Sequence, residues 1–309
     1  FNYDGTAFAT AESASDNLLS LRTHKQLLYL LGERTIEPWQ NIGTANFPFA
    51  RISGGTLSRG IIGAHAITAE DETLFLIGDD RIAYKLSGTQ MGRISTHAIE
   101  QAWQKYATIS DAFGFAYTFN GHKFIGFTFP TVAKTWFYDI ASSSSWPMWH
   151  ERESRDLNGV ALGRWRVNCA LAAYGKTLVG DVYTGKIGYL DDTTFTEFGD
   201  QIYAEAVGTP AHADGKPIFV SEFRLEMEQG VGLTSGQGSD PQVMLDISRD
   251  GGRTFDDQQE WMSLGKIGEY RTELSWRRLG QAIEWLPRIT ISDPVRRVIH
   301  GATAEFEIG

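Results

Sequence analysis

The sequence predicts an all-β protein, namely a β-propeller followed by a second antiparallel, sandwich-like β unit, with one short helix. Three observations carry this prediction. The 309 residues are rich in glycine (33) and aromatics (12%) and poor in charged residues (21%), which suits many short strands and tight turns. An apolar strand that ends in glycine recurs along the first part of the chain. From residue 201 onward this pattern changes to longer alternating runs.

The repeat places an apolar strand in front of Gly32, Gly78, Gly126 and Gly180, which are 46, 48 and 54 residues apart. These intervals are slightly longer than the ~40–45 residues typical of a propeller blade, a small sheet that cannot bury its own faces. We therefore expect blades in a first domain at 1–200, with an irregular β-sandwich as the alternative. After Gly32, Gly78 and Gly180 the chain turns and resumes in an aromatic-bearing strand, at 35–39, 81–85 and 186–190, whereas the third unit reaches such a strand later, at 135–139.

One helix is expected within this first domain, at residues 95–107. Ser95 or Thr96 can cap its N-terminus, and five apolar side chains recur at helical spacing on one face. Because about 13 residues are marginal as an isolated helix, packing across the blades must hold it. The apolar face consists of Ala98, Ile99, Ala102, Trp103 and Tyr106.

Residues 201–309 are expected to form a second domain, either a small β-sandwich or a last sheet that caps the propeller. Apolar and polar residues alternate at 218–228, 243–250 and 288–293, which indicates strands with one buried face. Gly-rich or polar turns separate these runs, including the segment 229–241.

The stretch SRDGGRTF at 248–255 fits the Asp-box pattern that recurs on the blades of sialidases and similar glycosidases. Asp-Gly at the apex of a hairpin supplies positive-φ residues and an aspartate that can accept hydrogen bonds from turn amides. The pattern occurs once here, outside the repeating blades. We therefore interpret Asp250, Gly251, Gly252 and Thr254 as a structural turn.

No catalytic, cofactor-binding or metal-binding residue is predicted. A sialidase-type site needs arginines from several blades, whereas the arginines here cluster at 276–280 and 293–301. The seven histidines lack the close spacings of zinc motifs, and the sequence has neither a phosphate-binding P-loop nor a G-x-S-x-G elbow. A carbohydrate-binding or sialidase-like propeller stays as the alternative, because Trp39, Trp146 and Trp149 could stack on sugar rings.

The net charge and the cysteine content restrict the kinds of partner that we expect. The formal net charge of -10 argues against affinity for the phosphate backbone of nucleic acids. Cys169, the only cysteine, lies in the apolar run VNCALAAY and is expected to be a buried thiol. No apolar run approaches the ~20 residues that span a bilayer, and the N-terminus lacks a signal-peptide layout, so we expect a soluble protein with no membrane partner.

Taken in order, several segments resemble the packaged-DNA stabilisation protein, or tail hub, of short-tailed double-stranded DNA phages. The resemblance covers residues 11–43, with a similar strand pair, then 93–106, with the helix, and 137–149. It resumes at WRRLG (276–280) and ITISDPV (289–295), which are similar to the closing strands of that family. The order of the segments carries the resemblance, because each one is short.

This resemblance implies a virion structural protein of the phage tail that has no catalytic site and no cofactor and is assembled in the cytoplasm of the bacterial host. It implies a six-fold ring below the portal-adaptor ring, which closes or extends the channel after packaging and helps to seat tailspikes or a needle. DNA would pass through without specific binding, because an acidic wall does not hold phosphates. Family members carry additional N-terminal sequence, so we expect the propeller to be incomplete at the N-terminus.

A ring of identical subunits requires one surface of each copy to meet a different surface of its neighbour. We expect arginine-rich stretches of one copy to contact acidic turns of the next, with ordinary surface solvation as the alternative. The candidate interface residues are Arg277, Arg278, Arg296, Arg297, Asp79 and Asp80.

Overall fold

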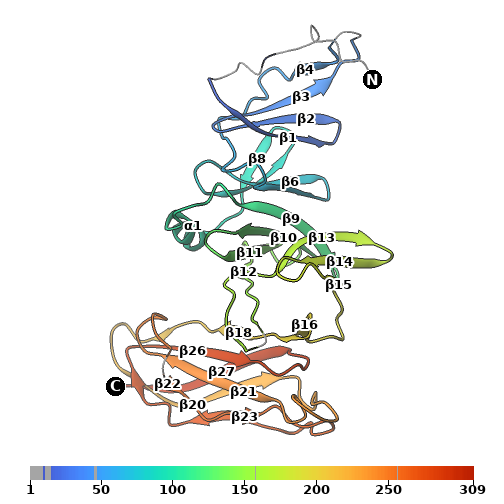
Figure 1. Cartoon of the computed structure of the whole chain (residues 1–309). Coiled ribbons are helices and arrows are strands. Elements are labelled where there is room, and N and C mark those ends of the chain that lie inside the picture. The colour runs from blue at the N-terminus through green and yellow to red at the C-terminus, as the bar shows by residue number, and fades with distance from the viewer. Residues whose placement is uncertain (1–9, 11–14, 45–46, 157, 256) are drawn as a thin grey trace. The chain divides into compact units, whose positions relative to one another are not determined.

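The structure, a computed structural model, describes residue 10 and residues 15–44, 47–156, 158–255 and 257–309 (Figure 1). The chain divides into two compact units, which are considered separately. The first unit contains residues 1–154 and 161–190, and the second contains residues 155–160 and 191–309. Strands dominate both units, and α1 is the one helix among the described residues, so the predicted fold class is confirmed.

Four antiparallel sheets follow one another along the first unit, and we call them blades 1 to 4 (Figure 1). Blade 1 contains β1 (Leu18–His24), β2 (Leu27–Gly32), β3 (Ile36–Asn41) and β4 (Phe49–Arg51). Blade 2 contains β5 (Ile67–Glu70), β6 (Thr73–Ile77), β7 (Ala83–Ser87) and β8 (Gln90–Arg93). Blade 3 contains β9 (Phe113–Phe119), β10 (His122–Phe129), β11 (Lys134–Asp139) and β12 (Trp149–Glu151). Blade 4 has three strands, β13 (Val167–Ala173), β14 (Lys176–Asp181) and β15 (Ile187–Tyr189).

The repeat that the sequence predicted is present in all four blades. Gly32 ends β2, Gly78 directly follows β6, and Gly126 and Gly180 lie within β10 and β14, so every repeat glycine lies in or directly after the second strand of a blade. The aromatic-bearing segments are the third strands β3, β7, β11 and β15. Close packing explains one of these glycines, because a Cβ atom at Gly126 would lie 2.5 Å from a ring carbon of Phe137.

The core of the first unit is shared between neighbouring blades. Tyr29 and Leu31 of blade 1, Leu74 and Leu76 of blade 2, and Phe127 of blade 3 belong to one buried apolar cluster. Blades 1, 2 and 3 thus bury apolar faces against one another, as expected of sheets too small to bury both faces alone.

Polar contacts between the first hairpins of successive blades support these seams. The Lys25 ammonium in blade 1 lies 2.8 Å from the Glu72 carboxylate in blade 2. The hydroxyl of Thr177 in blade 4 donates to the carbonyl of Thr118 in blade 3 at 3.0 Å. Equivalent turns of the repeat therefore meet along the row of blades.

Helix α1 (His97–Gln104) lies between blades 2 and 3 in the sequence and packs by its predicted face. Ile99 and Trp103 are buried, and the Trp103 ring contacts the rings of Phe129 (centroids 5.3 Å apart) and Trp149 (5.8 Å). Ala98, which was predicted to lie on the packed face, is exposed. Tertiary contacts of Trp103 thus anchor a helix of eight residues, which is too short to be stable alone.

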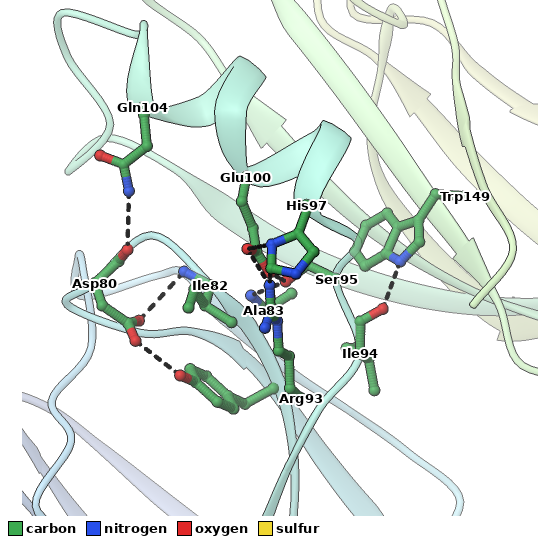
Figure 2. Close-up of polar contacts among 11 residues, drawn as sticks. Asp80, Ile82, Ala83, Arg93, Ile94, Ser95, His97, Glu100, Gln104 and Trp149 are labelled. Atoms are coloured by element: carbon green, nitrogen blue, oxygen red, sulfur yellow. Dashed lines mark hydrogen bonds and ion pairs between the residues drawn. The ribbon is translucent and has the colours of Figure 1, made fainter. Parts of the chain in front are cut away.

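The polar contacts of α1 differ from the expected capping arrangement (Figure 2). Thr96 is the N-cap residue, but its side chain makes no capping hydrogen bond. The Ser95 hydroxyl instead donates to the Glu100 carboxylate at 2.5 Å and accepts a hydrogen bond from the backbone N–H of Ala83 at 3.1 Å. Arg81 donates to three carbonyls at the end of the helix, including that of Trp103 at 3.0 Å. These bonds fasten both ends of the helix to blade 2.

The second unit is an antiparallel β-sandwich with a small hairpin, β16 (Thr196–Glu197) and β17 (Asp200–Gln201), at its start. One sheet has the order β18-β26-β21-β22, with β19 pairing with β26 and β23 with β21. The other sheet pairs β20 with β24, β25 and β27. The strands of the first sheet are β18 (Ala204–Val207), β19 (Ala211–His212), β21 (Gln242–Ser248), β22 (Asp257–Gln258), β23 (Met262–Ser263) and β26 (Glu284–Ile291). Those of the second sheet are β20 (Ile218–Met227), β24 (Leu274–Arg277), β25 (Gln281–Ala282) and β27 (Ile299–Ile308).

The two sheets of the sandwich enclose their own core. Val220 and Leu225 of β20 and Leu245 of β21 are buried together with Trp285 and Ile289 of β26. Burial alternates along β20, as the alternating sequence at 218–228 predicted.

Cys169 is exposed, so the predicted burial of its thiol is wrong. The apolar run around it forms β13, and Cys169 pairs with Gly180 on the side of the strand that is opposite to Ala170. An apolar run indicates a buried thiol only if both faces of the strand are covered, and the face that carries Cys169 is open to solvent.

Candidate functional site

The Asp-box stretch is a tight turn between β21 and β22, and its aspartate is fully engaged within the turn. The Asp250 carboxylate accepts hydrogen bonds from the Ser248 hydroxyl (2.7 Å) and from the backbone N–H of Arg253 (2.9 Å). It also accepts from the backbone N–H (3.0 Å) and the hydroxyl (2.8 Å) of Thr254. These bonds, led by the one from the Thr254 backbone, hold the pKa of Asp250 well below its usual range. Gly251 and Gly252 have φ values of +74° and +87°.

The two candidate acidic residues of the interface already have partners within blade 2 and its connections. Arg59 lies 3.4 Å from the Asp79 carboxylate and 3.1 Å from the Asp80 carboxylate. Asp80 also accepts a hydrogen bond from the Tyr84 hydroxyl at 2.7 Å, and burial together with this bond raises the pKa of Tyr84 to about 12. One arginine thus offsets part of the charge of two carboxylates, and the turn at residues 79–80 is tied into its own unit.

Three of the four candidate arginines are also engaged within the second unit. Arg277 lies 2.9 Å from the Glu222 carboxylate, and Arg296 lies 3.2 Å from a carboxylate oxygen of Glu228. Arg297 donates to the backbone carbonyls of Ile202 and Asp293 and is largely buried, which lowers its pKa.

Arg278 stands apart from the other arginines. It is exposed, adopts a left-handed backbone conformation (φ +60°), and borders a hollow of about 460 Å³ that Phe219 and Glu307 also line. The sequence could not separate the four arginines, because their partners come from distant strands.

The three tryptophans considered for sugar stacking differ in exposure. Trp39 is buried, and its indole N–H donates to Glu37 at 3.0 Å. Trp149 is half-buried and donates to the carbonyl of Ile94 at 2.8 Å, whereas Trp146 is 66% exposed. Two of the three thus serve the packing of the blades, and only Trp146 offers an open ring.

The described residues present no arrangement typical of a metal site or a membrane span. No group of three or more His, Cys, Asp and Glu side chains is placed to hold a metal ion within this part of the chain. Likewise, no described helix has the length and apolar character needed to cross a membrane.

The most unusual surface of the first unit is the outer face of blade 4, which we call the blade 4 end face. Strand register places its side chains on one side of β13, β14 and β15. Leu171, Ile187 and Tyr189 are 66%, 78% and 50% exposed. The end face consists of Cys169, Leu171, Leu178, Ile187 and Tyr189.

Blade 1 also carries apolar side chains on one side of its sheet. Leu21 pairs with Leu30, and Leu28 lies two residues before Leu30 on the same side of the sheet. Leu21 is 55% exposed, and Leu28 and Leu30 are half-buried. These three residues are called the blade 1 end face. Sequence analysis missed both end faces, although the alternation of Cys169 and Leu171 in β13 could have revealed one of them.

Two family models match the chain over most of its length. The first, described as "Bacteriophage P22 Gp10, beta-propeller", matches residues 1–195. The second, described as "Bacteriophage P22 Gp10, beta-sandwich", matches residues 205–307. The two domains and the two family matches together define the class of protein. It is a tail-associated structural protein of a bacteriophage. The chain belongs to the P22 Gp10 family of phage packaged-DNA stabilisation proteins, as the sequence resemblance indicated.

Other comparisons add little. No curated protein matches the chain. Among solved structures, a glycoside hydrolase is similar over 95% of this chain and 85% of its own, with 9% identity and a TM-score of 0.24. A family 43 arabinoxylan arabinofuranohydrolase from Bacillus subtilis, in complex with cellotetraose, is similar over 94% and 79%, with 9% identity and a TM-score of 0.30. With TM-scores below 0.5, neither similarity says anything about the fold or activity of this chain.

Proposed function

We propose that this protein is the tail hub, or nozzle, of a short-tailed phage. In this role it forms a six-fold ring that closes or extends the portal channel after DNA packaging and later conducts the DNA during ejection. The observation that carries the proposal is the match of P22 Gp10 family models to both the propeller and the sandwich.

The charge of the chain supports a role as a conduit. A net charge of -10 disfavours stable contacts with phosphates, because each Lys or Arg contact adds a salt-dependent hold on DNA. Several of its arginines are moreover paired with carboxylates within their own unit, as Arg59 is with Asp79 and Arg277 with Glu222. DNA would therefore pass through the ring without specific binding.

The partners in this proposal are further copies of the chain, the portal-adaptor ring above the hub, and tailspike or needle proteins. Assembly takes place in the cytoplasm of the host bacterium. The protein has no catalytic role, in keeping with an Asp-box turn whose carboxylate is saturated by its own turn.

The test is a phage with a nonsense mutation in the gene of this chain. We expect heads that package DNA but lose it, because the channel stays open, and we expect the wild-type gene supplied in trans to restore DNA retention. Immunogold labelling of purified virions should place the chain at the tail. Stable, infectious particles without the chain, or label on the head alone, would refute the proposal.

A further inference from the structure

A hollow of about 370 Å³ lies in the second unit, between the glycine-rich segment 236–240, the start of β21 and the residues that follow β26. Gln242 and Met244 line it from β21. Along this strand they alternate with Val243 and Leu245, which belong to the core of the sandwich, so the hollow lies on the outer side of the sheet. Its volume is within the range of about 300–1,000 Å³ that is typical of small-molecule sites.

An open indole ring borders this hollow. Trp261 lines it and is 54% exposed. Strand pairing explains this position, because the next residue, Met262, pairs with Val243, which is buried in the core. The side chain of Trp261 therefore lies on the opposite, outer side of the sheet. A tryptophan ring that is open to solvent beside a hollow offers a flat apolar surface and an N–H donor to a ligand.

Two carboxylates that line the hollow are held in place by bonds within the sandwich. The Ser263 hydroxyl donates to Oδ1 of Asp240 at 2.5 Å. The backbone N–H of Gln242 donates to Oδ2 of Asp293 at 2.8 Å. Each bond engages one oxygen of its carboxylate, so the second oxygen can accept a hydrogen bond from a ligand. The side-chain amide of Gln237, which also lines the hollow, adds a group that can both donate and accept.

The chemistry of this lining selects the class of ligand. A sugar ring has an apolar face that can stack on the indole of Trp261, and hydroxyl groups that donate and accept hydrogen bonds. The carboxylates of Asp240 and Asp293 repel anions such as phosphates, and a simple cation would leave donors such as the Gln237 amide unused. We propose that the hollow is a binding site for a neutral carbohydrate, a role that goes beyond the proposed hub function and does not depend on it.

Saturation-transfer NMR on the purified full chain tests this site. The probes are neutral tetrasaccharides of glucose, mannose, galactose and rhamnose, with tetragalacturonate as the anionic probe and choline as the cationic probe. We expect saturation transfer to the ring protons of at least one neutral tetrasaccharide and none to tetragalacturonate. Transfer to none of the neutral probes would overturn the inference. The corresponding monosaccharides show whether the site takes a sugar chain or a single ring, and either result supports the inference.

Substitution of the indole tests where the sugar binds. Trp261→Ala should weaken binding of the neutral tetrasaccharide by about ten-fold or more, whereas Trp261→Phe should weaken it less, because it keeps a ring. Both variants should melt at nearly the temperature of wild type, because Trp261 is 54% exposed. Trp146→Ala is the matched control, since Trp146 is 66% exposed but belongs to the first unit, and should bind as wild type does.

Removal of one charge separates a sugar from a cation as the ligand. Asp240→Asn keeps a carbonyl that can accept from Ser263 or from a ligand hydroxyl, so the neutral tetrasaccharide should bind nearly as tightly as to wild type. A cation held by the indole and the carboxylates should instead bind much more weakly to this variant.

Two further outcomes would overturn the inference while leaving the proposed function intact. If Trp261→Ala binds the neutral tetrasaccharide as wild type does, or if Trp146→Ala loses the binding, the sugar binds elsewhere on the chain. If choline binds, Asp240→Asn abolishes that binding and no neutral sugar binds, the hollow is a cation site. Absence of the chain from tails would instead defeat the proposed hub function and would leave the carbohydrate site untouched.

Discussion

The two units of this chain solve the problem of covering a sheet in different ways. In the sandwich, two sheets cover each other, so residues such as Leu225 and Leu245 are buried without help from outside the unit. In the row of blades, each sheet depends on the next, so burial stops at the last blade, where Ile187 is 78% exposed. Two sheets that pack face to face bury each other's apolar side chains. A row of stacked sheets leaves an apolar face exposed wherever a sheet has no neighbour.

The units also differ in their buried charges. Blade 4 contains a guanidinium–carboxylate pair, Arg166 and Asp181, whose side chains are 6% and 0% exposed. In the sandwich, Arg277 and Arg296 pair with carboxylates but are themselves 67% and 63% exposed. We therefore expect the stability of the first unit to depend more strongly on an ion pair in which both side chains are buried.

The largest expected effect concerns helix α1 of the first unit. Trp103→Ala removes a completely buried indole that contacts Phe129 and Trp149, and should destabilise the first unit by roughly 3–5 kcal/mol. Hydrogen-exchange mass spectrometry should show faster exchange in blades 2 and 3 and unchanged exchange in the sandwich. Trp285→Ala, in the sandwich core, should give the reverse pattern. Equal loosening of both units by either variant would show that they are not energetically separate.

The next effect concerns the buried ion pair of blade 4. Asp181→Asn should cost about 3 kcal/mol, because it leaves the Arg166 guanidinium buried without its countercharge. Asp192→Asn, at an exposed turn, is the matched control and should be neutral. Urea unfolding of the two variants provides the comparison, and equal midpoints would argue against a stabilising pair.

The same aspartate should make blade 4 sensitive to acid. Burial acts to raise its pKa, but hydrogen bonds from Arg166 and Thr184 outweigh this and lower the pKa of Asp181 to about 2. Since the folded-state pKa is below the unfolded value of about 3.8, the stabilisation is complete above that value and is lost as the pH falls toward 2.

A pH effect closer to neutrality is expected from His150 in blade 3. Burial, and then the charge of Arg152, lower the pKa of His150 to about 4, and its Nε2 accepts a hydrogen bond from Arg152 at 3.0 Å. The unfolded chain binds a proton near pH 6.5, whereas the folded chain does not, so stability should fall between pH 6.5 and 4 by at most about 3 kcal/mol. His150→Gln should flatten this pH dependence in thermal melts. A wild-type slope that persists in the variant would assign the effect to another group.

Local sequence patterns predicted much of this architecture. The glycine and aromatic periodicity located the second and third strands of every blade, since strand pairing within a blade is local in sequence. The alternation at 218–228 identified β20, and the helical spacing of Ile99 and Trp103 identified α1.

The exposed faces and the polar partners could not be predicted in the same way. Whether Cys169 is buried depends on which surface covers β13, and no local pattern records that. Arg278 differs from Arg277 only in its surroundings, because Glu222 on a distant strand engages Arg277. Such properties arise from long-range contacts, so the sequence indicated the elements but not the free surfaces.

The smallest expected effect concerns the Asp-box turn of the sandwich and separates a structural role from a chemical one. Asp250→Ala removes the acceptor for four hydrogen bonds within the turn and should lower the melting temperature of the second unit slightly, with the first unit unchanged. Asp250→Asn should lower the melting temperature less, because the asparagine side chain keeps one carbonyl acceptor. Since the pKa of Asp250 is depressed, the contribution of the turn should be present above pH 3.8 and be lost in stronger acid. Neither wild type nor variant should cleave a fluorogenic sialoside or aryl glycosides. Turnover by wild type that disappears in Asp250→Ala would mean that the turn takes part in hydrolysis. That result would contradict the purely structural role proposed for this protein.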